Sequence, residues 1–334
     1  MTTTRQGEII VAGEFRKTVD FDPTGDGDVR RSHGGRDIFV TKLSSEGEYL
    51  WTYTAGGVED LDRPHDVVVG DDDIVYVAGN FEDTVDFDEF GQGDVRRSAG
   101  YSDIFVVSLA SNGVYRWGVT IGGPGIDSGW AIAFDESILV AGNFDDDVDF
   151  DPGEGEDVRT SAGSLDVFVA RYLADGSYAG VRTFGGELAD DATGLAVDRD
   201  GNALVAGLFE SLEMDFDPTV GVDPGRSNGE WDAYVVKLYC GSCDAVERHD
   251  LSVRKDKLRS RVWALAPQGR VTVECESRRG SARKSATIGE NFIADLKFKD
   301  LPKGDYECRV LKVEDADGRR LCSEPSGFRS ISIK

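Results

Sequence analysis

One five-residue phrase returns four times along the chain: Val-Ala-Gly, a variable residue, then Phe. The copies begin at Val11, Val77, Val140 and Val205, which are 66, 63 and 65 residues apart. A fixed period of this size, built from short β-type segments, is typical of an architecture that uses one supersecondary unit repeatedly. A residue that recurs at the same place in every unit is therefore expected to hold each unit together rather than to perform chemistry at a single site.

Charge divides the chain into two parts. Residues 1–244 hold 49 Asp and Glu against 17 Lys and Arg, a net charge of −32, whereas residues 245–334 hold 14 against 20, a net charge of +6. We therefore expect two domains, residues 1–250 and 251–334. The acidic part would repel phosphate groups, which argues against a nucleic-acid partner and favours cations. No apolar run is long enough to span a membrane.

Each unit contains four strand-like segments, judged by alternation and by β-branched and aromatic residues. In the last unit they are residues 194–198, 203–209, 233–238 and, more weakly, 240–243; the fourth strand is clearer at 49–54 and 115–120. Glu46-Gly47, Asn112-Gly113 and Asp175-Gly176 supply turns before the fourth strand. In the first unit the place of the opening strand falls on residues 1–4, so we expect this unit to lack that strand. Residues 1–8 also lack the apolar stretch of an export signal. Four antiparallel strands per repeat predict an all-β protein, a β-propeller of about four blades.

The phrases Val-Ala-Gly-x-Phe, Thr-Val-Asp-Phe-Asp-Pro and Gly-x-x-Asp-Ile-Phe-Val, with the Gly-Gly after the fourth strand, resemble the bacterial β-propeller repeat of large secreted and surface proteins. The resemblance covers roughly residues 5–243. It implies an extracellular or cell-surface scaffold rather than a particular reaction. A closed four-bladed ring is the first expectation; an open fragment, or a ring completed by a partner chain, is the alternative.

An acidic insertion of about twenty residues separates the second and third strands of each unit. Two aspartates flank a phenylalanine in every copy, so in an extended segment both carboxylates share one face and the ring points to the other. Carboxylates beside a Gly-rich turn suit calcium, which takes only oxygen ligands. The predicted ligands are Asp20, Asp22, Asp86, Asp88, Asp149, Asp151, Asp215 and Asp217.

A structural interpretation of the insertions remains open beside the calcium sites. Arginine follows every acidic stretch, at Arg30, Arg96, Arg159 and Arg226. Charge-assisted pairing with these arginines would hold the insertion in place without metal. The inter-blade loops are acidic too and should lie at the same end of the blades.

A second shared pattern, Ser-x-Gly-x-x-Asp, begins at Ser32, Ser98, Ser161 and Ser227. Ser and Asp in turns readily bond nearby backbone N–H groups, so we expect a structural role. No histidine recurs near these positions to act as a base. His33, His65 and His249 are scattered and are expected to be surface or turn residues. Paired carboxylates occur in glycosidases, but such enzymes need two acids in different environments, and these copies are nearly identical.

Trp51 and Trp117 occupy equivalent places in the fourth strand and are expected to pack between blades, with sugar stacking as the alternative. Cys240 and Cys243 have C-x-x-C spacing within a predicted turn. A local disulfide is preferred there over free thiols, a redox motif or half a zinc site.

The C-terminal part does not continue the repeats and has a different residue pattern. Its strand-like segments are 262–265, 270–275, 292–298, 306–310 and 330–333. Five short strands without helical periodicity predict a β-sandwich. The approach to Tyr306 resembles the tyrosine corner of fibronectin type III and related immunoglobulin-like domains. Cys275 paired with Cys308 would link the sheets, whereas Cys308 with Cys322 would link neighbouring strands. The basic stretches 254–257 and 278–284 are interpreted as linker and loop, or as a surface for an acidic partner.

The sequence thus predicts a non-enzymatic binding or scaffold protein of the cell surface or exterior, stabilised by calcium, with a protein or carbohydrate ligand and a role such as adhesion. A carbohydrate-active enzyme on the propeller scaffold and a purely structural spacer are the alternatives.

Overall fold

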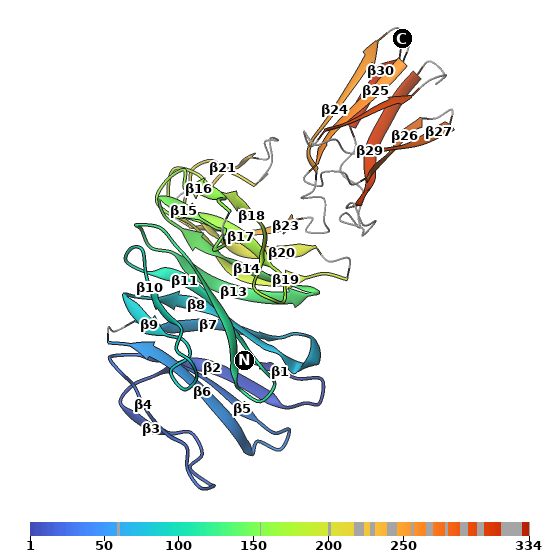
Figure 1. The fold of residues 1–334 in the computed structure, drawn as a ribbon. Coiled ribbons are helices and arrows are strands. Elements are labelled where there is room, and N and C mark those ends of the chain that lie inside the picture. Colours follow the sequence, from blue (N-terminus) through green and yellow to red (C-terminus); the bar gives the residue numbers. More distant parts are fainter. Residues whose placement is uncertain are drawn as a thin grey trace. The chain divides into compact units, whose positions relative to one another are not determined.

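The computed structural model describes the chain except for residues 59–60, 154, 200–201, 217–223, 228–230, 239–245, 255–256, 265–269, 278–279, 288–292, 299–303, 315–328 and 334 (Figure 1). Strands after Leu238 are described by their backbones. The described residues form an all-β protein of several antiparallel sheets, with a single 3-10 turn at Asp71–Asp73. They divide into two compact units: Met1–Asp198 with Ala203–Lys237, and Arg199–Asn202 with Leu238–Lys334.

Four sheets follow one another along the first unit, in the strand orders β1-β2-β5-β6, β7-β8-β11-β12, β13-β14-β17-β18 and β19-β20-β23. The first two comprise β1 (Thr2–Thr3), β2 (Ile9–Phe15), β5 (Asp37–Leu43), β6 (Tyr49–Gly57), β7 (Arg63–Val69), β8 (Val75–Phe81), β11 (Asp103–Leu109) and β12 (Tyr115–Ile121). The others comprise β13 (Ser128–Asp135), β14 (Ser137–Phe144), β17 (Asp166–Tyr172), β18 (Tyr178–Phe184), β19 (Asp190–Val197), β20 (Ala203–Phe209) and β23 (Asp232–Leu238). The first repeat, expected to lack its opening strand, has the two-residue strand β1 paired with β2 at that place.

Each acidic insertion forms a short antiparallel hairpin. The hairpins are β3 (Thr18–Asp20) with β4 (Val29–Arg31), β9 (Thr84–Asp86) with β10 (Val95–Arg97), β15 (Asp147–Asp149) with β16 (Val158–Thr160), and β21 (Met214–Asp215) with β22 (Pro224–Gly225). β9 also pairs with the end of β6, so the insertion of the second repeat extends the sheet of the first. The second hairpin therefore connects the first two repeats, and an isolated bridge between Gly186 and Met214 joins the third repeat to the hairpin of the fourth.

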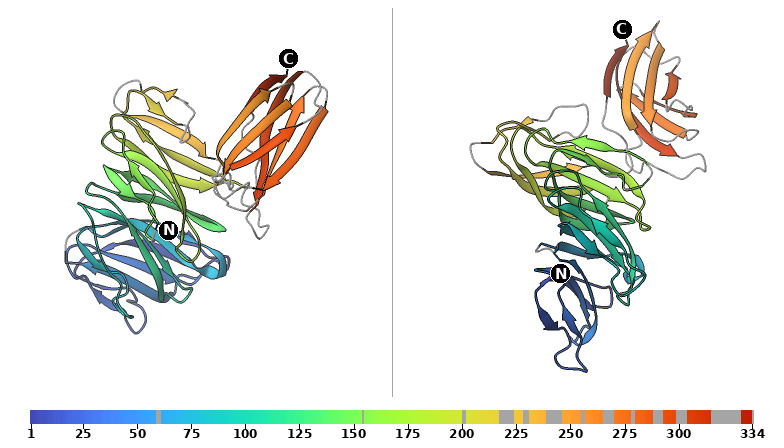
Figure 2. Two further views of the ribbon diagram at one scale, coloured as in Figure 1. Left: turned by 45° about the horizontal axis from the view of Figure 1, so that its top comes forward. Right: turned by 60° about the vertical axis from the view of Figure 1, so that its left-hand side comes forward.

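The four sheets of the first unit stack face to face in chain order, from blue through green to yellow in Figures 1 and 2. β2 packs on β7, β7 and β8 pack on β13, and β13 and β14 pack on β19. The first and fourth sheets lie at opposite ends of this stack in both figures. Among the described strands the stack is open, so the expected closed ring of four blades is not observed.

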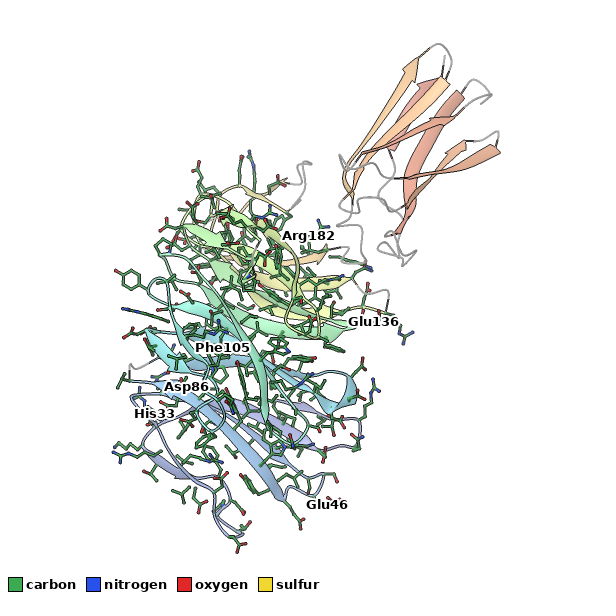
Figure 3. All side chains as sticks on the ribbon, in the orientation of Figure 1. His33, Glu46, Asp86, Phe105, Glu136 and Arg182 are labelled. Carbon is green, nitrogen blue, oxygen red and sulfur yellow. The ribbon has the colours of Figure 1, made fainter. Side chains whose placement is uncertain are left out.

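Period-two alternation explains why the inner sheets are buried on both faces. Successive strand residues point to opposite faces; in β11, Phe105 and Val107 join the core shared with the first sheet, whereas Ile104 and Val106 join the core shared with the third. Phe105 is labelled within the stack in Figure 3. The near-continuous hydrophobic runs in the middle repeats follow from this double burial.

The second unit consists of two antiparallel sheets, in the orders β24-β25-β28 and β27-β26-β29-β30. Their bounds are β24 (Val246–Arg254), β25 (Lys257–Ala264), β26 (Arg270–Ser277), β27 (Gly280–Thr287), β28 (Ile293–Phe298), β29 (Gly304–Glu314) and β30 (Arg329–Ile333). β24 contacts β30, and β27 contacts β28, from one sheet to the other. β24 crosses the domain boundary that the sequence predicts at residue 250.

Two sequence interpretations in the second unit are wrong. The basic stretches contribute to β24, β25 and β27 rather than to linker and loop alone; Arg, Lys, Ser and Ala lack the β-branched enrichment that marks a strand. Cys275 and Cys308 are directly opposite each other on β26 and β29, within one sheet. A bond between them would link neighbouring strands, not the two sheets. Cys322 and the Cys240–Cys243 segment lie outside the described residues.

Candidate functional site

The first aspartate of each insertion organises its own hairpin loop. The Oδ1 atom of Asp20 accepts the backbone N–H groups of Asp22 at 3.1 Å and Asp28 at 3.0 Å. Asp86 and Asp149 repeat both bonds, at 2.9 to 3.1 Å, to residues two and eight positions later. Local side-chain to backbone bonds of this kind are how Asp stabilises a turn.

The second aspartate closes the tip of the same loop. Asp22 accepts the N–H of Gly25 at 3.0 Å, Asp88 that of Gln92 at 2.7 Å, and Asp151 that of Gly153 at 2.9 Å. The phenylalanine between the two aspartates points to the opposite side, as expected; Phe87 and Phe150 are fully buried, and each contacts two further phenylalanines.

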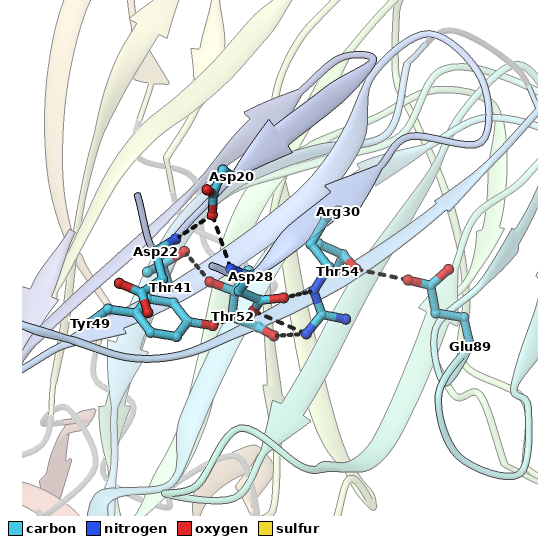
Figure 4. A network of polar contacts seen from close by, with 9 residues as sticks. All are labelled: Asp20, Asp22, Asp28, Arg30, Thr41, Tyr49, Thr52, Thr54 and Glu89. Atoms are coloured by element: carbon cyan, nitrogen blue, oxygen red, sulfur yellow. Dashed lines mark hydrogen bonds and ion pairs between the residues drawn. The ribbon is translucent and has the colours of Figure 1, made fainter. Parts of the chain in front are cut away.

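A third aspartate, which was not among the predicted ligands, holds the insertion to the sheet (Figure 4). Arg30 donates to Asp28 through Nε at 2.6 Å and Nη2 at 3.1 Å, and the Tyr49 hydroxyl donates to Asp28 Oδ2. Although burial opposes it, bonding to Arg30 and Tyr49 lowers the pKa of the Asp28 carboxyl. Asp94 with Arg96 and Tyr115, and Asp157 with Arg159 and Tyr178, repeat this arrangement. Arginine therefore pairs with the loop, but through this third aspartate rather than through the Asp-Phe-Asp pair.

The predicted calcium ligands do not form a metal-binding group in the described part of the chain. No set of three or more His, Cys, Asp or Glu side chains there is arranged to hold a metal ion. Backbone N–H groups already occupy carboxylate oxygens of the six predicted ligands in the first three repeats. Asp215 lies at the end of β21, and Asp217 lies outside the described residues. Each of the six carboxylates therefore holds its own loop through one oxygen atom, and the calcium sites stay a prediction.

The Ser-x-Gly-x-x-Asp pattern also has structural partners. The Ser32 hydroxyl accepts the N–H of Lys17 at 2.8 Å, and Lys17 has a left-handed φ of 62°. Asp37 is 1% exposed and accepts the N–H of His33 at 2.9 Å. Ser98 with Asp103, and Ser161 with Asp166, make the equivalent bonds. These residues stabilise a strained turn.

A further set of buried aspartates joins each repeat to the next. Asp62, Asp127 and Asp190 are at most 1% exposed. Asp127 accepts the N–H of Gly123 at 2.7 Å, from the end of the preceding repeat, and that of Asp145 at 3.0 Å, from its own repeat. Burial, chiefly, raises the pKa of Asp62 and of Asp127 to about 7, and the nearby carboxylates of Asp37 and Asp103 add to it. Their 65- and 63-residue spacing could have identified them in the sequence.

The paired glycines after the fourth strand are required by this junction. A Cβ at Gly122 would lie 2.2 Å from the Asp103 carboxyl carbon, and one at Gly123 would lie 2.3 Å from the Asp147 carbonyl oxygen. Gly56 and Gly57 are equally close to Asp37 and Thr84. The first glycine of each pair thus faces an aspartate of its own sheet and the second faces the insertion hairpin of the next repeat, so neither position has room for a side chain.

Trp51 and Trp117 pack between repeats, as expected. The indole N–H of Trp51 donates to the Ser111 carbonyl at 3.1 Å, and that of Trp117 donates to the Ala174 carbonyl at 3.2 Å. Each carbonyl belongs to the turn before the fourth strand of the following repeat. Both side chains therefore serve the stacking of the sheets.

Two positions in each repeat differ between copies although the framework around them is the same. One is the variable residue of the Val-Ala-Gly-x-Phe phrase: Glu14, Asn80, Asn143 and Leu208. The other position is a β-bulge in the opening strand of the second, third and fourth repeats, where one residue has no partner on the neighbouring strand. The bulge residues are His65, Trp130 and Thr193. Bulges often re-aim a side chain and are over-represented beside functional sites.

Four of these side chains and Asp191 join in one line of contacts, which we call the polar row: His65, Asn80, Trp130, Asn143 and Asp191. His65 Nε2 bonds Asn80 Oδ1 at 2.7 Å, and its ring lies 4.0 Å from that of Trp130. Trp130 Nε1 donates to Asn143 Oδ1 at 3.4 Å, and Asn143 Nδ2 donates to Asp191 Oδ1. Burial lowers the pKa of His65. Trp130 remains 38% exposed.

Ion pairs continue this line into the first repeat. Glu14 pairs with Arg36 at 2.9 Å and with Arg63 at 3.4 Å. His65 thus belongs to a shared cluster rather than to an isolated surface position. His33 is half exposed, as expected of a turn residue, and contacts the carboxylates of Asp37 and Glu89 at 3.1 Å each (Figure 3 labels His33).

The fold and these contacts describe an all-β protein in which like sheets are joined by like polar contacts. No model of a protein family matches the chain. The chain is 31% identical over 172 residues to the regulatory protein FlaEY of Caulobacter vibrioides. The match takes in 50% of this chain but only 17% of that protein. Within the described residues, no helix has the length and apolar character to cross a membrane.

Proposed function

We propose that the protein is a non-enzymatic binding and scaffold protein of the cell surface or exterior. The observation that carries this proposal is that the repeated residues and the variable residues have different roles in the structure. The repeated aspartates, serines, arginines and glycines have partners within the fold. Four residues at the variable positions, two from the second repeat and two from the third, instead bond or contact one another and Asp191 in the polar row.

We further propose that the first unit is built of propeller-type blades in an open stack, and that the second is a fibronectin type III-like sandwich. The strand orders β24-β25-β28 and β27-β26-β29-β30 support the second proposal, because they divide seven strands into sheets of three and four, as in immunoglobulin-like sandwiches. The residue pattern of the repeats supports both the first proposal and the exterior location. A protein or a carbohydrate is the expected ligand, and the acidity of the first unit disfavours nucleic acid.

A retention assay with product analysis tests this function. The full chain, immobilised, is exposed to purified cell-surface proteins and to a panel of polysaccharides, and the eluates are analysed for new chain ends. Retention without cleavage supports a binding protein. Cleavage that is abolished by an Asp→Asn change in one repeat would instead establish a carbohydrate-active enzyme, and a lack of any retention would leave a structural spacer.

A further inference from the structure

We propose that the polar row, His65, Asn80, Trp130, Asn143 and Asp191, is a binding site for an uncharged carbohydrate. This inference rests on the proposed binding function and names the class of ligand and the residues that recognise it. Nothing in the repeating framework requires these residue types, since Thr193 and Leu208 stand at the equivalent positions of the fourth repeat.

An exposed aromatic ring supplies the first element of such a site. Trp130 lies in the β-bulge of β13, and the His65 ring contacts it at 4.0 Å with an interplanar angle of 34°. The bulges of the second and third repeats therefore present a pair of aromatic rings in contact, rather than a single side chain. An indole that is 38% exposed offers an apolar face for the C–H groups of a sugar ring, with its polar N–H turned to Asn143.

Amide and carboxylate groups beside the ring supply the second element. Asn80 and Asp191 are partly exposed and together offer a donor and acceptors, which suits vicinal hydroxyl groups that donate and accept at once. Asn143 is 5% exposed and instead bonds Trp130 and Asp191. Their mutual bonds hold these side chains in place before a ligand arrives. Binding would then cost little side-chain entropy.

The charge pattern selects an uncharged ligand. Glu14 pairs with both Arg36 and Arg63, so these neighbouring cations already have a carboxylate partner. The surrounding part of the chain, residues 1–244, has 49 acidic against 17 basic residues, a net charge of −32. An acidic polysaccharide would be repelled by this field. A neutral, hydroxyl-rich ligand avoids the repulsion and matches the row.

The test uses the full chain and soluble neutral oligosaccharides of glucose, mannose, galactose and N-acetylglucosamine, measured by calorimetry, with an acidic uronic-acid oligosaccharide for comparison. We expect binding of at least one neutral oligosaccharide. Trp130→Ala should weaken it by about tenfold or more, equivalent to roughly 1.4 kcal/mol. Trp231→Ala is the matched control, because Trp231 is also exposed, at 45%, but lies outside the row.

Salt dependence and a conservative variant distinguish loss of stacking from other causes of weaker binding. The affinity should change little between about 0.05 and 0.5 M NaCl, because screening affects charged pairs and not a neutral ligand. Trp130→Phe, which keeps an aromatic ring, should retain more binding than Trp130→Ala, so a folding defect is distinguished from loss of stacking. Thermal melts of each variant establish that it is folded.

Several outcomes would overturn the inference. Equal binding by wild type and a folded Trp130→Ala variant would move the site elsewhere and leave the binding function standing. If the chain bound the acidic oligosaccharide more tightly, or if only a protein was retained in the retention assay, the ligand would not be an uncharged carbohydrate. Absence of retention in both assays would remove the proposed function itself.

Discussion

The carboxylate of Asp62 accepts the backbone N–H of Gly57 at 2.9 Å, across the junction between the first and second repeats. The same bond joins Asp127 to Gly123 and Asp190 to Gly186, both at 2.7 Å. Buried backbone donors need partners, and an acceptor that is itself buried is costly unless it is fully bonded. Each junction therefore depends on one aspartate, and the first two also on a pair of glycines whose close neighbours leave no room for a side chain.

The stability of the first unit should fall as the pH rises from about 4 to about 7. The pKa of Asp127 is about 7 in the folded protein, above its ordinary value of 3.8, so the protonated form favours folding. Its contribution is complete below the unfolded pKa and is lost as the pH rises through 7. The pKa values of Asp62 and Asp166, about 7 and about 6, act in the same direction.

Urea unfolding across this pH range measures the effect. Asp127→Asn should flatten the pH dependence and, at pH 5, cost about 1–3 kcal/mol because its amide faces N–H donors. Asp26→Asn is the control, since Asp26 is exposed and the substitution removes the same charge. An unchanged slope in Asp127→Asn would contradict the assignment.

Gly123→Ala should destabilise the stack strongly, by about 2 kcal/mol or more, because overpacking moves backbone rather than a flexible side chain. The added Cβ would lie 2.3 Å from the Asp147 carbonyl oxygen. Gly194→Ala is the matched control: its Cβ would meet nothing closer than Ala206 at 3.8 Å. Comparable melting temperatures for the two variants would show that the junction is looser than described.

Tyr115→Phe should lower the free energy of unfolding by about 1 kcal/mol, the usual worth of a hydrogen bond. Its hydroxyl donates to Asp94, which also pairs with Arg96 and anchors the insertion of the second repeat. Chemical denaturation measures the loss. Tyr101→Phe should have no effect, because Tyr101 is 78% exposed.

Calcium should not raise the melting temperature above the effect of magnesium. Asp20 and Asp22 already accept backbone N–H groups, so we expect the insertions to fold without metal. Melts with chelator, then with millimolar calcium or magnesium, test the predicted sites. If calcium did bind, a calcium concentration of about 100 times the dissociation constant would stabilise the folded protein by roughly 2.7 kcal/mol.

The double variant Asp20→Asn with Asp22→Asn keeps oxygen acceptors for the N–H bonds while removing both charges. A calcium-specific rise in the wild type that this variant loses would establish the metal sites and set aside the hydrogen-bonded account of the loop.

The sequence by itself determined the main strands of the repeats in the first unit and the turns before the fourth strand, but not the short hairpins of the acidic insertions. The predicted segments 49–54, 115–120, 203–209 and 233–238 fall in β6, β12, β20 and β23, and Gly47, Gly113 and Gly176 do adopt left-handed φ values of 83° to 88°. Buried phenylalanines between paired aspartates were also predictable, because alternate residues face opposite ways. In the second unit, β27 was missed because Gly280–Thr287 lacks β-branched enrichment.

Only the tertiary structure decided which carboxylates cap a loop, which form ion pairs and which are buried between repeats. Asp20, Asp28 and Asp62 are the same residue type in acidic segments, yet one caps a loop, one pairs with Arg30 and one is buried at a junction. Asp20 is bonded within its own loop, whereas Asp28 also accepts the Tyr49 hydroxyl and Asp62 also accepts the Glu82 N–H, each about twenty residues away in the sequence. Local pattern does not contain these longer-range partners. The polar row likewise arises because a β-bulge and sheet stacking bring His65, 65 residues before Trp130, into contact with it.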